Sequence, residues 1–112
     1  MTLNIDIRLL DLYDDRFGLR VASEDQETFS FFEEHGLLGD GCTWQALVDA
    51  LVWAQMPDKR DKLEFTCEAE SLLIMSVDRA LLERVEALVR EVAQSEEAIL
   101  RAIASADPDL LE

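Results

Sequence analysis

Residues 63–78 have the sequence LEFTCEAESLLIMSVD, and this stretch decides the fold. In residues 63–70 apolar and polar side chains alternate strictly, which is typical of a strand with one buried face. Residues 72–77 form a run that is apolar apart from Ser76, which suits a central buried strand. The stretch therefore predicts two neighbouring strands, with Asp78 as the N-cap of a helix that follows.

The alternation in residues 63–70 also predicts an acidic strand face. Because successive side chains point to opposite sides of a strand, one set faces the core and the other faces solvent. The inward set is Leu63, Phe65, Cys67 and Ala69, and the outward set is Glu64, Thr66, Glu68 and Glu70. Three glutamates would then share one exposed surface.

The first half of the chain predicts a hairpin followed by two helices. Residues 3–9 alternate in the same way, and residues 17–22 can pair with them across an aspartate-rich turn. A short helix is expected over residues 26–35, ended by Gly36. Apolar residues at helical spacing predict a second helix over residues 44–55. Thr43 would be its N-cap, and Pro57 would end it.

Two more helices are expected at the C-terminal end of the chain. The helix after Asp78 has a continuous apolar face, and Ser95 can cap a final helix that Asp107-Pro108 would end. The predicted order is ββααββαα. This order favours a single α+β domain over residues 1–112, with a mainly antiparallel sheet of about four strands and helices packed on one side.

The charge of the chain limits what it can bind. It carries 25 acidic and 10 basic residues, a net charge of −15 on 112 residues, and the acids are spread along the whole sequence. Binding to nucleic acid by phosphate neutralisation requires lysine and arginine, and anionic membrane surfaces repel acidic proteins. We therefore expect no nucleic acid and no membrane among the partners, and a basic protein instead.

The expected compartment is the cytoplasm. The N-terminus lacks the basic and apolar regions of a secretory signal, and no apolar run approaches the ~18 residues that span a bilayer. Cys42 and Cys67 would then be reduced thiols. A disulfide between them is the alternative, and the sequence does not establish its geometry.

No catalytic, metal or cofactor site is expected. His35 is the only histidine, and it lies where a helix C-terminus is predicted, a position that favours a cationic ring. The two cysteines do not form a CxxC pair. An enzyme that uses Glu68 and Glu70 as a glycosidase-like carboxylate pair is a weaker alternative, because few aromatic residues are present to form a sugar platform.

Trp44 and Trp53 are candidates for a core residue and for a binding residue. They lie nine positions apart on one predicted helix, which places them about 180° apart around its axis. One is expected in the core. The other would be exposed, and an exposed tryptophan is a typical anchor of a protein interface.

Two segments resemble the Immunity protein 51 family of bacterial polymorphic toxin systems. Residues 39–44, Gly-Asp-Gly-Cys-Thr-Trp, are similar to its Gly-x-Gly-Tyr-Asp-Trp signature, with Cys42 and Thr43 in place of tyrosine and aspartate. Residues 64–73 are similar to the segment Phe-Asp-x-Glu-Ala of the family. The resemblance implies a non-enzymatic cytosolic antitoxin that binds and neutralises a cognate toxin made by the same cell.

The residues and the resemblance together predict a protein that is a monomer when free and a heterodimer with its toxin. On this hypothesis the partner is a basic toxin domain that acts on nucleic acid, and acidic side chains take the place of substrate phosphates. A small adaptor or regulatory subunit with a non-toxin partner is the alternative, and the glutamates could equally be a solvated strand face. The predicted partner-binding residues are Asp40, Trp44, Trp53, Glu64, Glu68 and Glu70.

Overall fold

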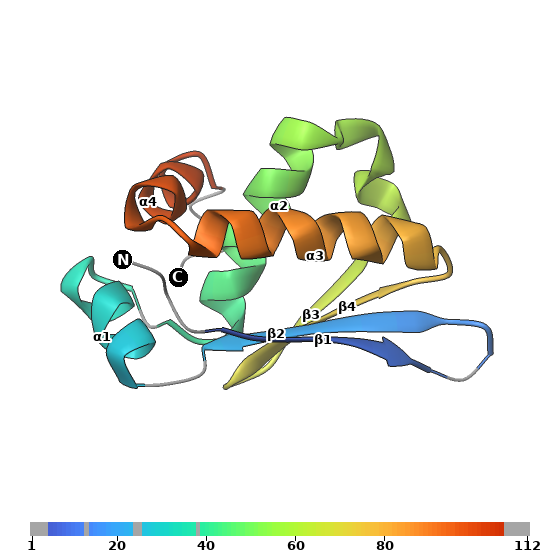
Figure 1. The fold of residues 1–112 in the computed structure, drawn as a ribbon, viewed down its shortest axis with the longest axis horizontal. Coiled ribbons are helices and arrows are strands. Elements are labelled where there is room, and N and C mark those ends of the chain that lie inside the picture. Colours follow the sequence, from blue (N-terminus) through green and yellow to red (C-terminus); the bar gives the residue numbers. More distant parts are fainter. Residues whose placement is uncertain (1–4, 13, 24–25, 38, 107–112) are drawn as a thin grey trace.

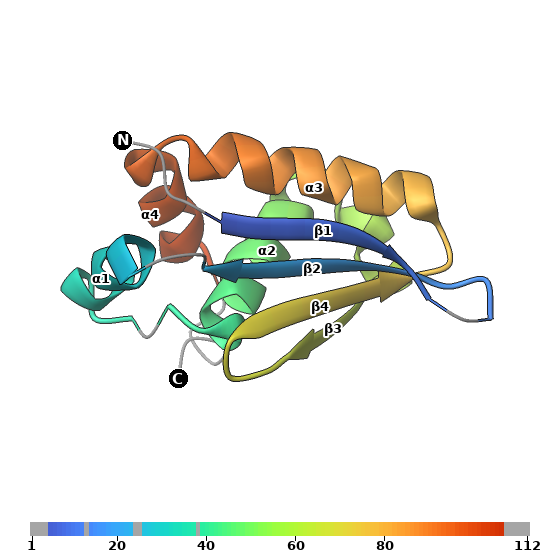
Figure 2. The ribbon, with the colours of Figure 1, turned by 60° about the horizontal axis from the view of Figure 1, so that its bottom comes forward.

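A four-stranded antiparallel sheet forms one layer of the protein. The computed structural model describes residues 5–12, 14–23, 26–37 and 39–106. The strands are β1 (Ile5–Asp11), β2 (Phe17–Ser23), β3 (Glu64–Cys67) and β4 (Ser71–Ser76). Their spatial order is β1-β2-β4-β3, as Figure 2 shows, and each neighbouring pair is antiparallel.

The helices lie on one side of this sheet. They are α1 (Gln26–Glu34), α2 (Gly41–Gln55), α3 (Arg79–Ala93) and α4 (Glu96–Ala104), with a short 3-10 helix, η1 (Pro57–Lys62), between α2 and β3. Figure 1 shows α2 and α3 over the same face of the sheet, while the opposite face carries no helix among the described elements. The predicted α+β class and the order ββααββαα are confirmed.

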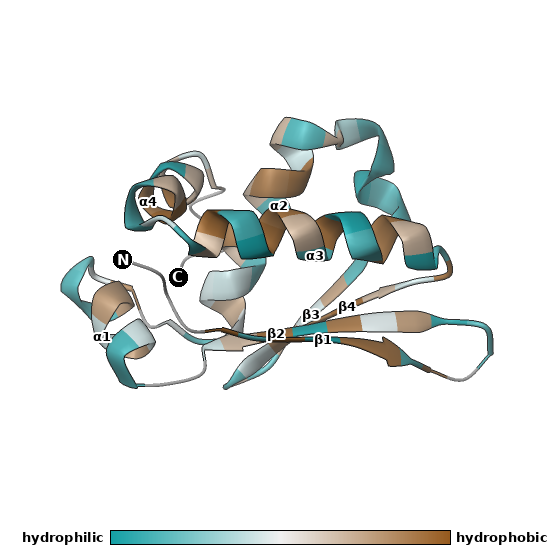
Figure 3. Ribbon diagram, in the orientation of Figure 1, coloured by the Kyte–Doolittle hydropathy of each residue, from teal (hydrophilic) through white to brown (hydrophobic). Residues whose placement is uncertain are grey.

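The core lies between the sheet and the two long helices. The inward side chains of Leu19, Val21, Leu72 and Ile74 on the central strands are fully buried. Figure 3 shows that hydrophobic residues recur along α2 and α3. The largest aliphatic members are Leu19, Leu47, Leu72, Ile74 and Leu82. Burial of each such side chain contributes about 1.5–3 kcal/mol to the free energy of unfolding, so this seam is the main source of stability.

Most of the predicted helix ends are confirmed. The Asp78 carboxylate accepts a hydrogen bond from the Leu81 amide at 3.2 Å, and the Ser95 hydroxyl accepts one from the Ala98 amide at 3.2 Å. Gly36 follows α1 with a φ of 76°, a left-handed conformation that glycine adopts without strain. His35 Nδ1 lies 2.9 Å from the carbonyl oxygen of Phe31, at the C-terminal end of α1.

Two predicted element ends are wrong, the start of the second helix and the end of β3. The second helix begins at Gly41, and its N-cap is Asp40 instead of Thr43. β3 ends at Cys67, so Glu68 and Glu70 lie in the turn to β4 and Ala69 is exposed. The predicted strand residue Leu3 and the predicted helix end at Asp107-Pro108 lie outside the described residues.

β4 differs from its prediction in another way. It is central in the sheet, as expected, but its burial alternates, because helices cover only one face. Leu72 and Ile74 are fully buried against the helices. Leu73 and Met75 are half-buried on the open face. A largely apolar run therefore marks a strand with two apolar faces, of which one remains accessible.

Candidate partner-binding surface

The start of α2 packs directly against the β3–β4 turn. A Cβ atom placed on Gly41 would lie 2.1 Å from the carbonyl oxygen of Ser71 and 2.3 Å from that of Glu68. Only glycine fits such a contact, since both distances are far below a normal van der Waals separation. The contact therefore holds Asp40, the residue before Gly41, beside the turn that carries Glu68 and Glu70.

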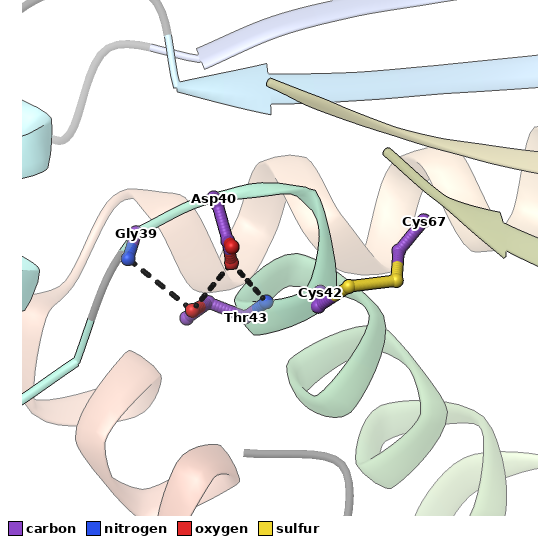
Figure 4. Close-up of a disulfide and its surroundings, with 5 residues drawn as sticks. All are labelled: Gly39, Asp40, Cys42, Thr43 and Cys67. Carbon is purple, nitrogen blue, oxygen red and sulfur yellow. Dashed lines mark hydrogen bonds between the residues drawn. A yellow bond between two sulfur atoms is a disulfide. The ribbon is translucent and has the colours of Figure 1, made fainter. Parts of the chain in front are cut away.

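A disulfide joins the same two segments. Cys42 in the first turn of α2 is bonded to Cys67 at the end of β3, with a Cα–Cα distance of 4.9 Å (Figure 4). The expectation of two reduced thiols is therefore wrong for this structure. The sequence could not decide the question, because 25 positions separate the two residues and only the packing of α2 on the sheet brings them together.

We expect reduction of this disulfide to lower the free energy of unfolding by about 3 kcal/mol. In the chain-entropy model the bond restricts the unfolded chain, and the effect follows from the length of the closed loop. Urea unfolding with and without dithiothreitol measures the difference. The double variant Cys42→Ser/Cys67→Ser is the control, and dithiothreitol should leave its unfolding midpoint unchanged. Equal midpoints for the oxidised and reduced wild type would contradict the prediction.

Asp40 has a structural role that is visible in Figure 4. Its Oδ1 atom accepts hydrogen bonds from the Thr43 amide at 3.0 Å and from the Thr43 hydroxyl at 3.1 Å. The Thr43 hydroxyl in turn accepts a bond from the Gly39 amide at 3.2 Å. These bonds fix the orientation of the carboxylate at the helix N-terminus. Thr43, which the sequence predicted as the cap, is instead the donor to the carboxylate of the actual cap, Asp40.

We call the group formed by Asp40, Glu68 and Glu70 the acidic corner. Glu68 and Glu70 are exposed, and Asp40 is half-buried. The surrounding sequence has no cation to neutralise them locally, since residues 21–58 and 63–78 contain neither lysine nor arginine. The corner is therefore a fixed patch of negative charge, positioned by a close backbone contact, a disulfide and a helix cap.

Glu64 does not belong to the acidic corner. It lies at the opposite end of β3, about 10 Å from Cys67 at ~3.3 Å per residue. Its carboxylate is 3.3 Å from the guanidinium of Arg16, and both side chains are exposed. The prediction grouped Glu64 with Glu68 and Glu70 because it assumed one long strand.

The two tryptophans have opposite environments. Trp44 is fully buried, and its indole N–H donates to the Ser23 hydroxyl at 2.9 Å. It therefore has no surface to offer a partner, and its predicted binding role is wrong for this structure. Trp53 is 55% exposed and borders a groove of about 430 Å³ between α2 and Ser105. Its predicted role as an anchor stays a prediction.

The open face of the sheet carries paired charges. The Asp6 carboxylate receives hydrogen bonds from Arg8 at 2.9 Å and from Arg20 at 2.8 Å. The bond from Arg8 is the largest cause of a lowered pKa for Asp6, and the nearby charges of both arginines add to it. Asp6 therefore stays ionised at neutral pH, and these three residues contribute little free charge to a partner.

Two features of the described residues bear on catalysis, the grouping of possible metal ligands and the placement of Glu68 and Glu70. In the part of the chain that the structure describes, no three histidine, cysteine, aspartate or glutamate side chains are grouped so that they could hold a metal ion. Glu68 and Glu70 lie in a turn, not side by side on a strand as the glycosidase alternative assumed. None of the described helices is long and apolar enough to cross a bilayer.

Comparison with known proteins gives one match. The sequence model of a protein family described as Immunity protein 51 matches residues 10–108, which is most of the chain. No curated protein and no solved structure matches. The matched range contains both segments of the predicted resemblance, the signature at residues 39–44 and the strand segment at residues 64–73. The chain therefore belongs to the Immunity protein 51 family.

Proposed function

We propose that this protein binds and neutralises a cognate bacterial toxin, and that the partner is a basic toxin domain that acts on nucleic acid. Membership of the Immunity protein 51 family is the observation that carries the proposal. The net charge of −15 supports the choice of a basic partner. The proposed complex is a heterodimer between one toxin domain and a protein that is a monomer when free, because copies of this charge repel one another.

The acidic corner is the proposed first contact with the toxin. Its carboxylates have the charge of nucleic-acid phosphates, so a cationic site that binds phosphate would attract them. Because Asp40, Glu68 and Glu70 are held on a fixed backbone, little ordering is required when the complex forms. Charge of this kind raises the association rate more than it raises the final affinity.

The proposed compartment is the cytoplasm, where a toxin made by the same cell is first met. Reducing conditions there would keep Cys42 and Cys67 as thiols. The hydrogen bonds of Asp40 and the contact of Gly41 with the turn are made by atoms other than those of the two cysteines. The acidic corner can therefore persist in the reduced protein, although the free energy of unfolding is lower.

A rescue assay tests the proposal. The toxin domain encoded beside this chain is expressed in a sensitive host with and without the protein, and the two are then co-purified. Rescue of growth together with a stable complex supports the immunity function. Continued toxicity without a complex contradicts it and favours the alternative, an acidic adaptor for a partner that is not a toxin.

Reversing the charge of the acidic corner should slow association with the toxin. We expect Glu68→Lys/Glu70→Lys to lower the association rate constant by about tenfold at low salt, since electrostatic steering contributes factors of about 10–10³. Stopped-flow or biosensor kinetics measure the change. The expected loss should shrink at high salt, where charge is screened within about 8–10 Å.

A matched control separates the local effect from the change in net charge. Glu91→Lys/Glu97→Lys changes two exposed glutamates on α3 and α4 and shifts the net charge by the same amount. Its association rate constant should fall by no more than about twofold. Equal losses in both double variants would show that the overall field, and not the acidic corner, attracts the toxin.

A further inference from the structure

A groove of about 690 Å³ lies on the open face of the sheet, at the end opposite the β3–β4 turn. It is lined by Leu12, Asp14, Arg16, Leu73, Met75 and Val77. Val77 is 71% exposed. Among the described residues, Val77 and Trp53 are the two large apolar side chains that are exposed. A single exposed apolar residue is ordinary on a protein, but Val77 lies beside the half-buried Leu73 and Met75 around this groove.

The strand register explains the hollow. Gly18 of β2 is paired with Met75 of β4 and has no side chain to fill the face between them. A Cβ atom on Gly18 would lie 3.2 Å from the Cδ1 atoms of both Leu12 and Leu73. The side chains of Leu12 and Leu73 cover Gly18, and the groove beside them has apolar walls.

The charged side chains around this groove indicate which kind of partner can bind in it. The carboxylates along it and its continuation are Asp14, Asp61 and Glu64, against the two cations Arg16 and Lys62. Glu64 already forms an ion pair with Arg16 at 3.3 Å. The carboxylate of Asp14, at the exposed tip of the hairpin, is therefore the one that can pair with a cation of the partner. A second copy of this chain would bring another −15 charges, so like-charge repulsion disfavours it.

We propose that the toxin inserts a bulky apolar side chain, flanked by lysine or arginine, into this groove. The inference rests on the proposed function and adds a second contact to the acidic corner. The apolar side chain packs against Leu73, Met75 and Val77, and the flanking cation lies beside Asp14.

One toxin domain can reach both contacts. Glu70 and Met75 are five residues apart, about 16 Å along an extended strand at ~3.3 Å per residue. An interface of ordinary size buries about 800 Å² on each partner and is about 30 Å across. The groove lies on the uncovered face of the sheet, and the β3–β4 turn forms one end of the same sheet (Figure 2), so a single surface patch of that size on the toxin reaches both.

The two contacts should control different rate constants. Surface charge acts at a distance and sets the association rate, whereas close apolar packing at a desolvated centre sets the dissociation rate. Variants of the groove should therefore change how long the complex lasts, and variants of the acidic corner should change how fast it forms.

The test uses Met75→Gln/Val77→Asn with the complete protein and its toxin. Both changes replace apolar groups by neutral polar groups of similar size, so the net charge is unchanged. We expect the dissociation rate constant to rise by about tenfold or more, as for interface anchors, and the association rate constant to stay within about twofold. Ala87→Ser/Ala104→Ser is the control, because it changes two exposed apolar residues on the helical side to neutral polar residues and should leave both rate constants unchanged. Trp53→Ser is measured beside it as the competing apolar anchor.

The outcomes separate this inference from the proposed function. Rescue and a complex with unaltered dissociation in the folded double variant would overturn the groove contact and leave the immunity function in place. Faster dissociation of Trp53→Ser alone would also overturn it, since the apolar anchor would then lie on the helical side. Absence of both rescue and complex with the wild type would overturn the proposed function itself. Circular dichroism and urea unfolding establish that each variant is folded.

Discussion

Replacement of Trp44 by alanine is expected to lower the free energy of unfolding by about 3–5 kcal/mol, the range for large aromatic residues in a core. Trp44 is fully buried, and its ring packs edge-on against Phe32 with the centroids 5.4 Å apart. The substitution would leave a cavity where α1, α2 and β2 meet. It would also remove the hydrogen bond from the indole to the Ser23 hydroxyl.

Two further variants provide comparison values for the loss in the free energy of unfolding. Trp44→Phe keeps most of the ring volume and removes the hydrogen bond, so the expected loss is smaller, about 1–2 kcal/mol. Trp53→Ala changes a side chain that is 55% exposed and should cost less than about 0.5 kcal/mol. Equilibrium urea unfolding followed by circular dichroism measures all three. If Trp44→Ala lowered the free energy of unfolding by less than about 1 kcal/mol, the result would show that Trp44 is not packed in the core as described.

The spacing of apolar residues along the sequence was sufficient to predict the strands and helices that form the two layers of this fold. Alternation in residues 3–9 predicted the first strand, with residues 17–22 as its hairpin partner, and helical spacing after Asp78 and Ser95 predicted α3 and α4. These signals are local, because a side chain that must face the core recurs at the period of its own element. Capping residues could be located for the same reason, since a cap bonds only to the next turn of its helix.

The long-range contacts could not be predicted in this way. Whether Cys42 and Cys67 meet depends on the angle at which α2 crosses β3, and no local pattern encodes that angle. The end of β3 was missed because Glu68 and Glu70 continue the alternation past the residue where strand pairing stops. The groove was missed because the run at residues 72–77 was interpreted as buried on both faces, and only the absence of helices on one side exposes it.

The family signature at residues 39–44 is best explained by packing. Gly39 has a φ of 73° and lies against the ring of Phe32, Gly41 fits against the carbonyl oxygens of Ser71 and Glu68, and Trp44 fills the core. Three of its positions therefore serve the local structure. The proposed binding surface is built around this segment, which fixes the start of α2 against the sheet and so places the acidic corner.

Gly41→Ala should be strongly destabilising, with a loss of about 3 kcal/mol or more in the free energy of unfolding, at the upper end for overpacking. The added methyl group would meet the carbonyl oxygens of Ser71 and Glu68 at 2.1 and 2.3 Å. Both obstacles are backbone atoms, so no side chain can rotate to make room. The Ser71 oxygen also accepts the Glu68 amide at 2.8 Å, and this bond closes the turn. Relief of the clash therefore requires α2 and the β3–β4 turn to move apart.

Gly36→Ala is the matched control for this substitution. Gly36 has a φ of 76°, yet nothing lies within 4 Å of an added Cβ atom. The change therefore carries only the conformational cost of a left-handed backbone, about 1–2 kcal/mol. Equilibrium urea unfolding compares the two variants, and a Gly41→Ala loss no larger than that of Gly36→Ala would contradict the close contact. If Gly41→Ala still folds, its association with the toxin should slow like that of the charge-reversed acidic corner, because Asp40 would no longer be held beside Glu68 and Glu70.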